Sequence, residues 1–292
     1  MINIKDKQNS QEILDLLFLQ RIYCEKIEYL TILIYILALM IPIIGFLTES
    51  CYYFIVINLF LILLNNYLII QRKKTISIMV TIKEIIDRTL FGLNLLNPQL
   101  ECSKETIEEL LIKQKEKKSE RYIKEISNSG VDTYRGVKDW YFYEDAPEDE
   151  KNILACQKQN VYFTKKLSKS FISSITFLIV TLSIAIIIIK PNLTIKDTII
   201  YYLYPFSTFI TLTWTDFFNY IDFKQILTEL KFKFKSLENK KYIPKKELEE
   251  IQNLIFLYRK TEYRPPLEIF HWKFSRNLHS CWEKIVKIKI NL

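Results

Sequence analysis

The carboxylates of Glu84 and Asp87 are the first side chains whose types and spacing could do chemistry. Residues three apart share one face of a helix, so the pair could exchange protons with a substrate or could anchor a neighbouring helix through ion pairs. No second catalytic group accompanies them, which favours the anchor. His271 and His279 lie two helical turns apart in an aromatic segment, and these surroundings favour packing over metal binding.

Motifs for other kinds of catalysis are absent from the sequence. The four glycines form neither a G-x-G-x-x-G nor a Walker A pattern, which excludes the common phosphate-binding loops. No G-x-S-x-G or H-E-x-x-H is present. The five cysteines are scattered without a C-x-x-C pair, which argues against a zinc site and a disulfide framework. We therefore expect a protein that is not an enzyme and that needs neither a cofactor nor a metal.

Polar residues inside long apolar runs carry a more specific signal. Asn58 and Asn65 are seven residues apart, which places both on one helix face about 10.5 Å apart. A second stripe steps by four, three and four residues: Tyr204, Thr208, Thr211 and Thr215. Unpaired polar groups are costly in lipid, so these sets either line a water path or hold helices together. Both interpretations stay open at this point.

The runs that hold these residues are long enough to span a membrane. A bilayer core about 30 Å thick needs roughly 20 apolar residues in a helix. Four uncharged runs meet this requirement, at residues 29–48, 50–71, 170–189 and 198–215. Their short connections pair them into two hairpins, 29–71 and 170–215.

The distribution of Lys and Arg predicts the orientation of these hairpins. The hairpin turns hold few basic residues, whereas residues 72–74 and 165–169 are basic and directly flank the runs. The positive-inside rule then places both termini and residues 72–169 in the cytoplasm. We assign the net charge of +8 largely to this rule, so no DNA or RNA duplex is expected as a partner.

The remaining segments predict helices, because they contain few glycines and place Leu and Ile at i, i+3, i+4 spacing. Residues 128–144 are expected to be irregular. Helices are expected over 11–28, 75–91, 103–126, 148–169, 216–240, 245–260 and 266–290. The predicted fold is an all-α membrane protein whose four spanning helices extend into one helical cytosolic domain, assembled from residues 1–28, 72–169 and 216–292.

Six short patterns occur in order along the chain: Q-N at 8–9, R-I-Y-C-E-K at 21–26, E-I-I-D at 84–87 with L-F at 90–91, D-W-Y at 139–141, C-Q-K-Q-N at 156–160, and I-Q at 251–252 followed by Arg259 and P-P at 265–266. In their order and spacing they resemble the SMODS-associating four-transmembrane effectors, which occur beside nucleotide-second-messenger synthases in bacterial antiphage defence operons. In the second pattern the tyrosine is displaced to Tyr23 and the alanine of the family pattern is lost, which leaves the roles of residues there open.

This resemblance implies an effector of the bacterial inner membrane that forms a pore or disrupts the bilayer and causes abortive infection. It also implies activation by a cyclic oligonucleotide and a functional link to the synthase that makes it. A homo-oligomer is expected, because one pair of hairpins could not enclose a water path. The alternative is a non-conducting membrane scaffold that recruits a cytosolic partner.

A cyclic oligonucleotide would be bound by cationic side chains at its phosphates and by aromatic rings at its bases. For Gln157 and Asn160, hydrogen bonding between helices is an equally open role. The candidate ligand-binding residues, all predicted to be cytosolic, are Trp140, Tyr141, Gln157, Asn160, Arg259 and Arg276.

Overall fold

The computed structural model describes residues 4–47, 52–94, 100–130, 132–141, 150–166, 206–238 and 240–261. Every extended element in these ranges is a helix, and the described residues form no strand beyond one isolated bridge between Ser129 and Lys138. The all-helical part of the predicted fold class is therefore confirmed.

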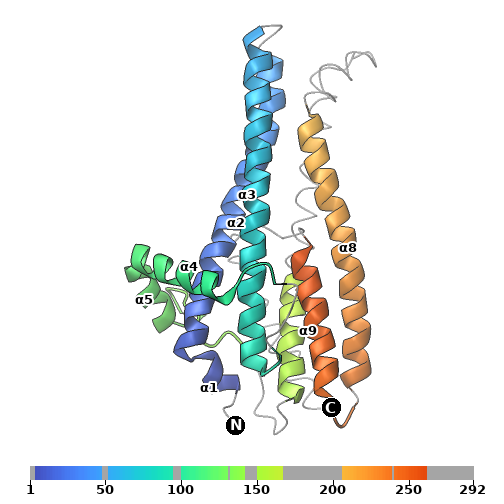
Figure 1. Cartoon of the computed structure of the whole chain (residues 1–292). Helices are drawn as coiled ribbons and strands as arrows, with labels where there is room; N and C mark the ends of the chain where they lie inside the picture. The colour runs from blue at the N-terminus through green and yellow to red at the C-terminus, as the bar shows by residue number, and fades with distance from the viewer. Residues whose placement is uncertain are drawn as a thin grey trace.

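Two long helices form the axis of the molecule. After the short α1 (Ile4–Gln8), α2 (Gln11–Leu47) and α3 (Tyr52–Phe91) run antiparallel along each other, as Figure 1 shows. Each joins a predicted cytosolic helix to a predicted spanning run without a break. Helix α3 ends at Gly92, whose φ of +62° suits a residue without a Cβ. There the amides of Gly92 and Leu93 donate to the carbonyls of Thr89 and Arg88, which satisfies the last turn.

Two shorter helices, α4 (Lys104–Lys117) and α5 (Ser119–Ser127), lie across the lower part of α2 (Figure 1). The expectation of one helix over 103–126 is wrong, because the backbone turns at Lys118. Ser103 caps α4 by accepting a bond from the Thr106 amide at 3.2 Å. Ion pairs fix the two helices to α2, including Lys115 with Asp15 at 2.5 Å and Arg121 with Glu25.

The rest of the described chain packs beside α3. A helix over residues 150–166 and α9 (Lys245–Lys260) stand alongside its lower half, and α8 (Ser207–Glu238) runs beside them and reaches higher (Figure 1). Helix α9 buries Leu248, Ile251 and Ile255, whose three- and four-residue spacing gives one apolar face. That face joins buried residues of α3, α8 and the 150–166 helix in one core cluster.

A separate apolar cluster lies higher along the axis. It joins Leu30, Ile34, Leu37 and Ala38 of α2 to Leu68 of α3 and to Phe209 and Leu212 of α8. Within the residues that the structure describes, no helix is both long and apolar enough to cross a membrane. The predicted run 170–189, residues 198–205 of the fourth run and the helix expected over 266–290 lie outside the described residues.

Candidate functional site: a buried polar network

Glu84 and Asp87 lie one turn apart near the lower end of α3, on the face turned toward α9. Both are almost fully buried. The Arg88 Nε atom donates to Glu84 Oε1 at 2.5 Å, and the other two nitrogens of Arg88 donate to the Asn94 carbonyl and the Asn253 side chain. The ion pairs of Glu84 and Asp87 confirm the interpretation of the two carboxylates as an anchor.

Helix α9 supplies the second cation. Arg259 Nη2 donates to Asp87 Oδ2 at 2.7 Å, and Nη1 lies 3.8 Å from Glu84 Oε2. About two α9 turns earlier on the same face, Gln252 Nε2 lies 3.0 Å from Glu84 Oε2 and 3.2 Å from Asp87 Oδ2. Residues 252 and 259 are seven apart, so both can reach the carboxylates from one side of α9.

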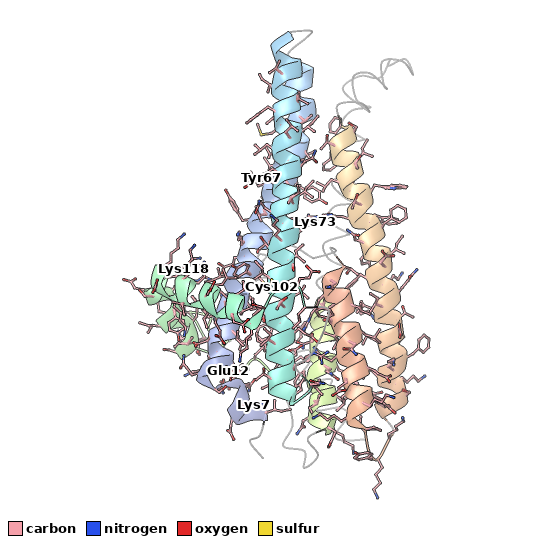
Figure 2. The ribbon with its side chains drawn as sticks, viewed as in Figure 1. Lys7, Glu12, Tyr67, Lys73, Cys102 and Lys118 are labelled. Carbon is pink, nitrogen blue, oxygen red and sulfur yellow. The ribbon has the colours of Figure 1, made fainter. Side chains whose placement is uncertain are left out.

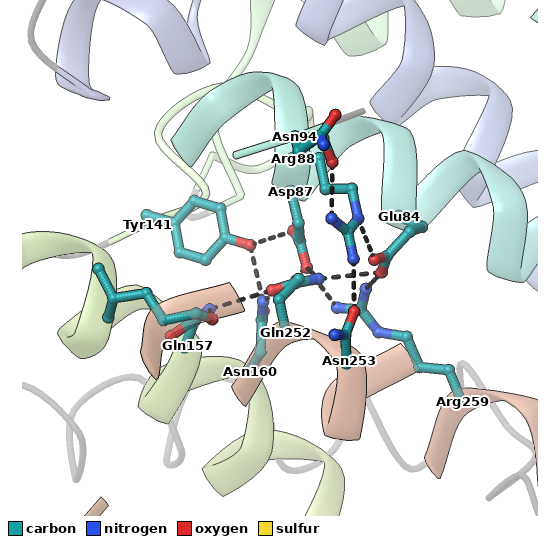
Figure 3. A network of polar contacts seen from close by, with 11 residues as sticks. Glu84, Asp87, Arg88, Asn94, Tyr141, Gln157, Asn160, Gln252, Asn253 and Arg259 are labelled. Atoms are coloured by element: carbon teal, nitrogen blue, oxygen red, sulfur yellow. Dashed lines mark hydrogen bonds and ion pairs between the residues drawn. The ribbon is translucent and has the colours of Figure 1, made fainter. Parts of the chain in front are cut away.

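The third set of partners comes from residues 141–160. The Tyr141 hydroxyl donates to Asp87 Oδ1 at 2.8 Å, and Asn160 Nδ2 donates to the same hydroxyl at 2.8 Å. Gln157 Nε2 donates to the Leu248 carbonyl at 3.0 Å and to Gln252 Oε1 at 3.2 Å. Figure 3 shows how these side chains converge on the two carboxylates; we call Glu84, Asp87, Arg88, Tyr141, Gln157, Asn160, Gln252 and Arg259 the polar network.

The N-terminal segment closes the network from outside. Gln8, which is buried, accepts a bond from the Tyr141 amide at 2.9 Å. Asn9 donates to Asp139 Oδ1 at 2.9 Å and accepts from the Asp139 amide at 3.1 Å. Asp139 has a φ of 52°, and these two bonds hold it in that conformation.

The charges of the polar network balance. Two carboxylates face two guanidinium groups, and buried charges are tolerated when they are paired and hydrogen-bonded in this way. Burial raises the pKa of Glu84, an effect that Arg259 and Arg88 oppose. Burial works against the charge of Arg259, yet Asp87 and Glu84 together raise its pKa above the ordinary value. Burial and then the charge of Asp87 raise the pKa of Tyr141, which therefore keeps its proton to donate.

The arrangement suits a structural junction better than acid–base chemistry. The carboxylates are almost fully buried, and each is held by a cation and an amide. The polar network joins α3, α9 and residues 141–160, with the carboxylates of Glu84 and Asp87 at its centre. A movement of α9 relative to α3 has to break or replace these bonds.

The structure brings four of the candidate ligand-binding residues together in this network: Tyr141, Gln157, Asn160 and Arg259. Trp140 lies beside them, half-buried against the lower core, and its carbonyl accepts a bond from Gln159 Nε2 at 3.1 Å. Arg276 lies outside the described residues. Gln157 and Asn160 make hydrogen bonds between helices, which was the open alternative for both residues. Their role in ligand binding stays a prediction.

Arg88, Asn253 and Gln252 belong to the site but were not predicted as site residues. Arg88 could have been found, because it follows Glu84 by four residues, the spacing of an ion pair along a helix. Gln252 stands seven residues before Arg259, which indicates a shared helix face. Asn253 carries no such signal, since its contact depends on how α9 is rotated.

The candidate pore-lining residues are not brought together in the described part of the chain. Asn65 is buried, whereas Thr211 and Thr215 are exposed and Thr208 is half-buried. The Thr215 hydroxyl donates to the Thr211 carbonyl of its own helix at 2.9 Å. The α8 face turned toward α2 and α3 is instead Phe209, Leu212 and Asp216. Tyr204 and the side chain of Asn58 lie outside the described residues.

Taken together, the described residues define a helical protein with a long hairpin and a buried polar junction below it. A family model described as the SMODS-associating 4TM effector domain matches residues 2–285. The chain belongs to this family, as the resemblance of its motifs predicted. The family name links the chain to a nucleotide-second-messenger synthase and to the CBASS type of antiphage defence.

No curated protein and no solved structure matches the chain. Family membership therefore carries the functional argument, and the geometry of the polar network supports it. Five of the six motif patterns that suggested the family contribute to this region: residues 8–9, 84–91, 139–141, 156–160 and 251–259 meet in the polar network or directly against it.

Proposed function

We propose that the chain is a membrane effector of antiphage defence that a nucleotide second messenger activates from the cytosol. In this proposal it resides in the bacterial inner membrane with both termini in the cytoplasm. Activated homo-oligomers form a pore or disrupt the bilayer, which ends in abortive infection. Family membership over residues 2–285 is the single observation that carries this proposal.

Exposed apolar side chains on the upper halves of α2, α3 and α8 support the membrane location. Phe60 and Leu63 of α3 are 64% and 60% exposed, and Trp214 of α8 is 62% exposed. A water-facing surface rarely carries so many large apolar groups together, whereas lipid or a neighbouring subunit would cover them. Others on these segments are Tyr29, Ile32, Ile36, Met40, Val56, Ile57, Leu59, Tyr67, Ile70, Ile210, Phe217 and Phe218.

The change of residue type along α3 supports the proposed orientation. Tyr67 and Lys73 mark this change in Figure 2, the aromatic ring standing above the first lysine along the helix. Tyrosine is enriched where a membrane meets water, and lysine is enriched on the cytoplasmic side. Lys73 and Lys74 are both exposed, so the body below them, with the polar network, would lie in the cytosol.

The polar network supports a mechanism of coupling. Helix α3 runs from the proposed membrane region directly into Glu84 and Asp87, so a ligand that shifts α9 acts on the hairpin through Arg259. An anionic ligand that drew Arg259 away would leave two buried carboxylates without their shared cation. Such a state is unfavourable by about 3–5 kcal/mol, enough to drive a rearrangement of α3. Trp140, Tyr141, Gln157, Asn160, Arg259 and Arg276 remain the proposed ligand-binding set.

Dye release from reconstituted vesicles tests this function. The full chain is placed in vesicles of phosphatidylethanolamine and phosphatidylglycerol, and a panel of synthetic cyclic di- and trinucleotides is added outside. Release with at least one cyclic nucleotide, but with none of the matching linear nucleotides, supports the proposal. Binding of a cyclic nucleotide without release supports the non-conducting scaffold instead.

A further inference from the structure

A second buried ion pair lies about 22 Å from the polar network, measured along α3 between residues 72 and 87. Arg72 of α3 places Nη2 3.7 Å from Asp216 Oδ1 of α8, and both side chains are only 6% exposed. Asp216 Oδ2 also accepts a bond from the Tyr35 hydroxyl of α2 at 2.6 Å. This cluster therefore joins three helices, α2, α3 and α8, through one carboxylate.

The position of this pair in the sequence is specific. Arg72 is the first charge after the uncharged run 50–71, and Asp216 is the first charge after the run 198–215. If these runs span the membrane, as the proposed function requires, the pair lies at their cytosolic end. A buried charge pair at that level is costly to form and is rarely found without a functional role.

Apolar side chains fill the space next to the pair on its membrane side. Leu68 precedes Arg72 by one turn, and Leu212 precedes Asp216 by one turn; both belong to the upper apolar cluster with Phe209. The ring of Phe209 meets Tyr35 edge-on, with centroids 6.1 Å apart. In an assembled pore, an apolar layer of this kind can block water and ions by dewetting.

Orphaned polar atoms surround this apolar layer. Both amide atoms of Asn65, Nε of Arg72 and Nδ2 of Asn219 are buried and have no hydrogen-bond partner among the residues that the structure describes. Asn65 stands seven residues before Arg72 on the same face of α3, and Asn219 stands three residues after Asp216 on α8. Buried polar groups are normally satisfied by protein or by water. In the described structure these atoms make no such bond. An open state in which water reaches them would therefore gain hydrogen bonds.

We propose that Arg72, Asp216 and Tyr35 form the closed gate of the membrane domain, and that opening separates α8 from the α2–α3 hairpin at this pair. This inference rests on the proposed function, because it assigns the regulation of the same pathway. Separation hydrates Arg72, Asp216 and Asn219 and parts Leu68 from Leu212. The pair holds the bundle shut until α9, which follows α8 directly in the chain, is displaced.

Reversing charges at the pair tests the gate without any nucleotide. Arg72→Glu sets two carboxylates against each other, and Asp216→Arg does the same with two cations. Breaking a buried pair shifts an equilibrium by about a hundredfold or more, so each single variant should raise resting dye release at least about tenfold. The double variant restores opposite charges and should return release toward the wild-type level. Lys74→Glu and Asp222→Arg are matched controls, because both side chains are exposed on the same helices.

The outcomes separate the gate from the proposed activation. Leaking single variants with a tight double variant support the gate, even if no nucleotide in the panel opens the wild type. Unchanged resting release in folded, inserted single variants overturns it. A lower melting temperature without leakage also overturns it, since the pair would then be only a packing contact. The neutral variants Arg72→Gln and Asp216→Asn, of which the second keeps side-chain size, provide the same readout if the reversed charges prevent folding.

Discussion

Arg259 donates to the carboxylate of Asp87 at 2.7 Å across 172 residues of sequence. The bond ties the end of α9 to the lower end of α3. Arg259 also lies 3.8 Å from Glu84, and Gln252 donates to the same oxygen of Asp87. Asp87 has four polar partners in the polar network, counting Tyr141 and Asn160. Removing any one partner is therefore expected to change the strength of the other bonds to Asp87.

Replacing Arg259 with methionine should destabilise the chain strongly. The substitution keeps an apolar stem but leaves Asp87 and Glu84 with one cation, Arg88, in a buried site. We expect a loss of about 3–5 kcal/mol in the free energy of unfolding, measured by chemical denaturation in detergent. The double variant Arg259→Met with Asp87→Asn should recover part of this loss, because it removes the uncompensated charge.

Lys260→Met is the matched control, since it alters the neighbouring cation, which is half-buried and pairs with Glu101 near the surface. Its effect should stay within about 1 kcal/mol. Equal losses in the Arg259 and Lys260 variants would contradict a special role for the polar network.

Tyr141→Phe should cost less, because only one hydroxyl is lost. That hydroxyl donates to Asp87 and accepts from Asn160. A net loss of about 1–3 kcal/mol is expected, since removing one partner leaves buried groups unsatisfied. Tyr242→Phe serves as the control, because Tyr242 is 70% exposed. If both tyrosine variants melt at the wild-type temperature, the bonds of Tyr141 contribute nothing to stability.

Gly136→Ala should damage the segment that carries residues 139–141. A Cβ built on Gly136 would lie 1.7 Å from the carbonyl oxygen of Asn128, so the backbone must move apart. A loss of about 1–3 kcal/mol in stability is expected from such overpacking. Gly130→Ala is the control in the same loop, because nothing lies within 4 Å of a Cβ there. Comparable melting temperatures of the two variants would show that the loop adapts freely.

Cys156 should resist alkylation in the native protein. Its side chain is fully buried, and burial raises the pKa of the thiol above its ordinary value of 9.0, an effect that the charge of Asp87 increases. Because the thiolate is the reactive form, a maleimide at pH 8 should react with native Cys156 at least about a hundredfold more slowly than with the unfolded chain. Raising the pH to 9 should accelerate the reaction of the unfolded chain with the maleimide and leave that of the native chain nearly unchanged.

A chain that keeps only Cys24, which is half-buried on α2, provides the comparison for this measurement. Native Cys156 reacting as fast as native Cys24 would mean that the junction around the polar network opens readily without a ligand.

Much of the fold could be predicted from the sequence, because helix periodicity is a local property. The expected helices over 75–91 and 245–260 coincide with the lower part of α3 and with α9. The break at Lys118 could not be predicted, since neither glycine nor proline marks it. There the contacts of the next turn determine the backbone conformation, because Tyr122 donates to Asp15 at 2.6 Å and packs edge-on against Phe18.

Some members of the candidate site were predictable, but its arrangement was not. Glu84, Asp87, Tyr141 and Arg259 were each singled out, yet pairing across 172 residues depends on how α9 is docked. On α8, the predicted hydroxyl stripe is offset by one residue from the buried face of Phe209, Leu212 and Asp216. One residue corresponds to a rotation of about 100°. Residue type alone does not reveal which of two adjacent faces the neighbouring helices will cover.

Electrical recording across a planar bilayer tests the central claim most directly. The full chain is inserted into a phosphatidylethanolamine–phosphatidylglycerol bilayer, and cyclic di- and trinucleotides are added to each side in turn. The account predicts current only with a cyclic nucleotide, and only from the side that the cytosolic body faces. A nucleotide that binds the inserted protein tightly and produces no current from either side would contradict it.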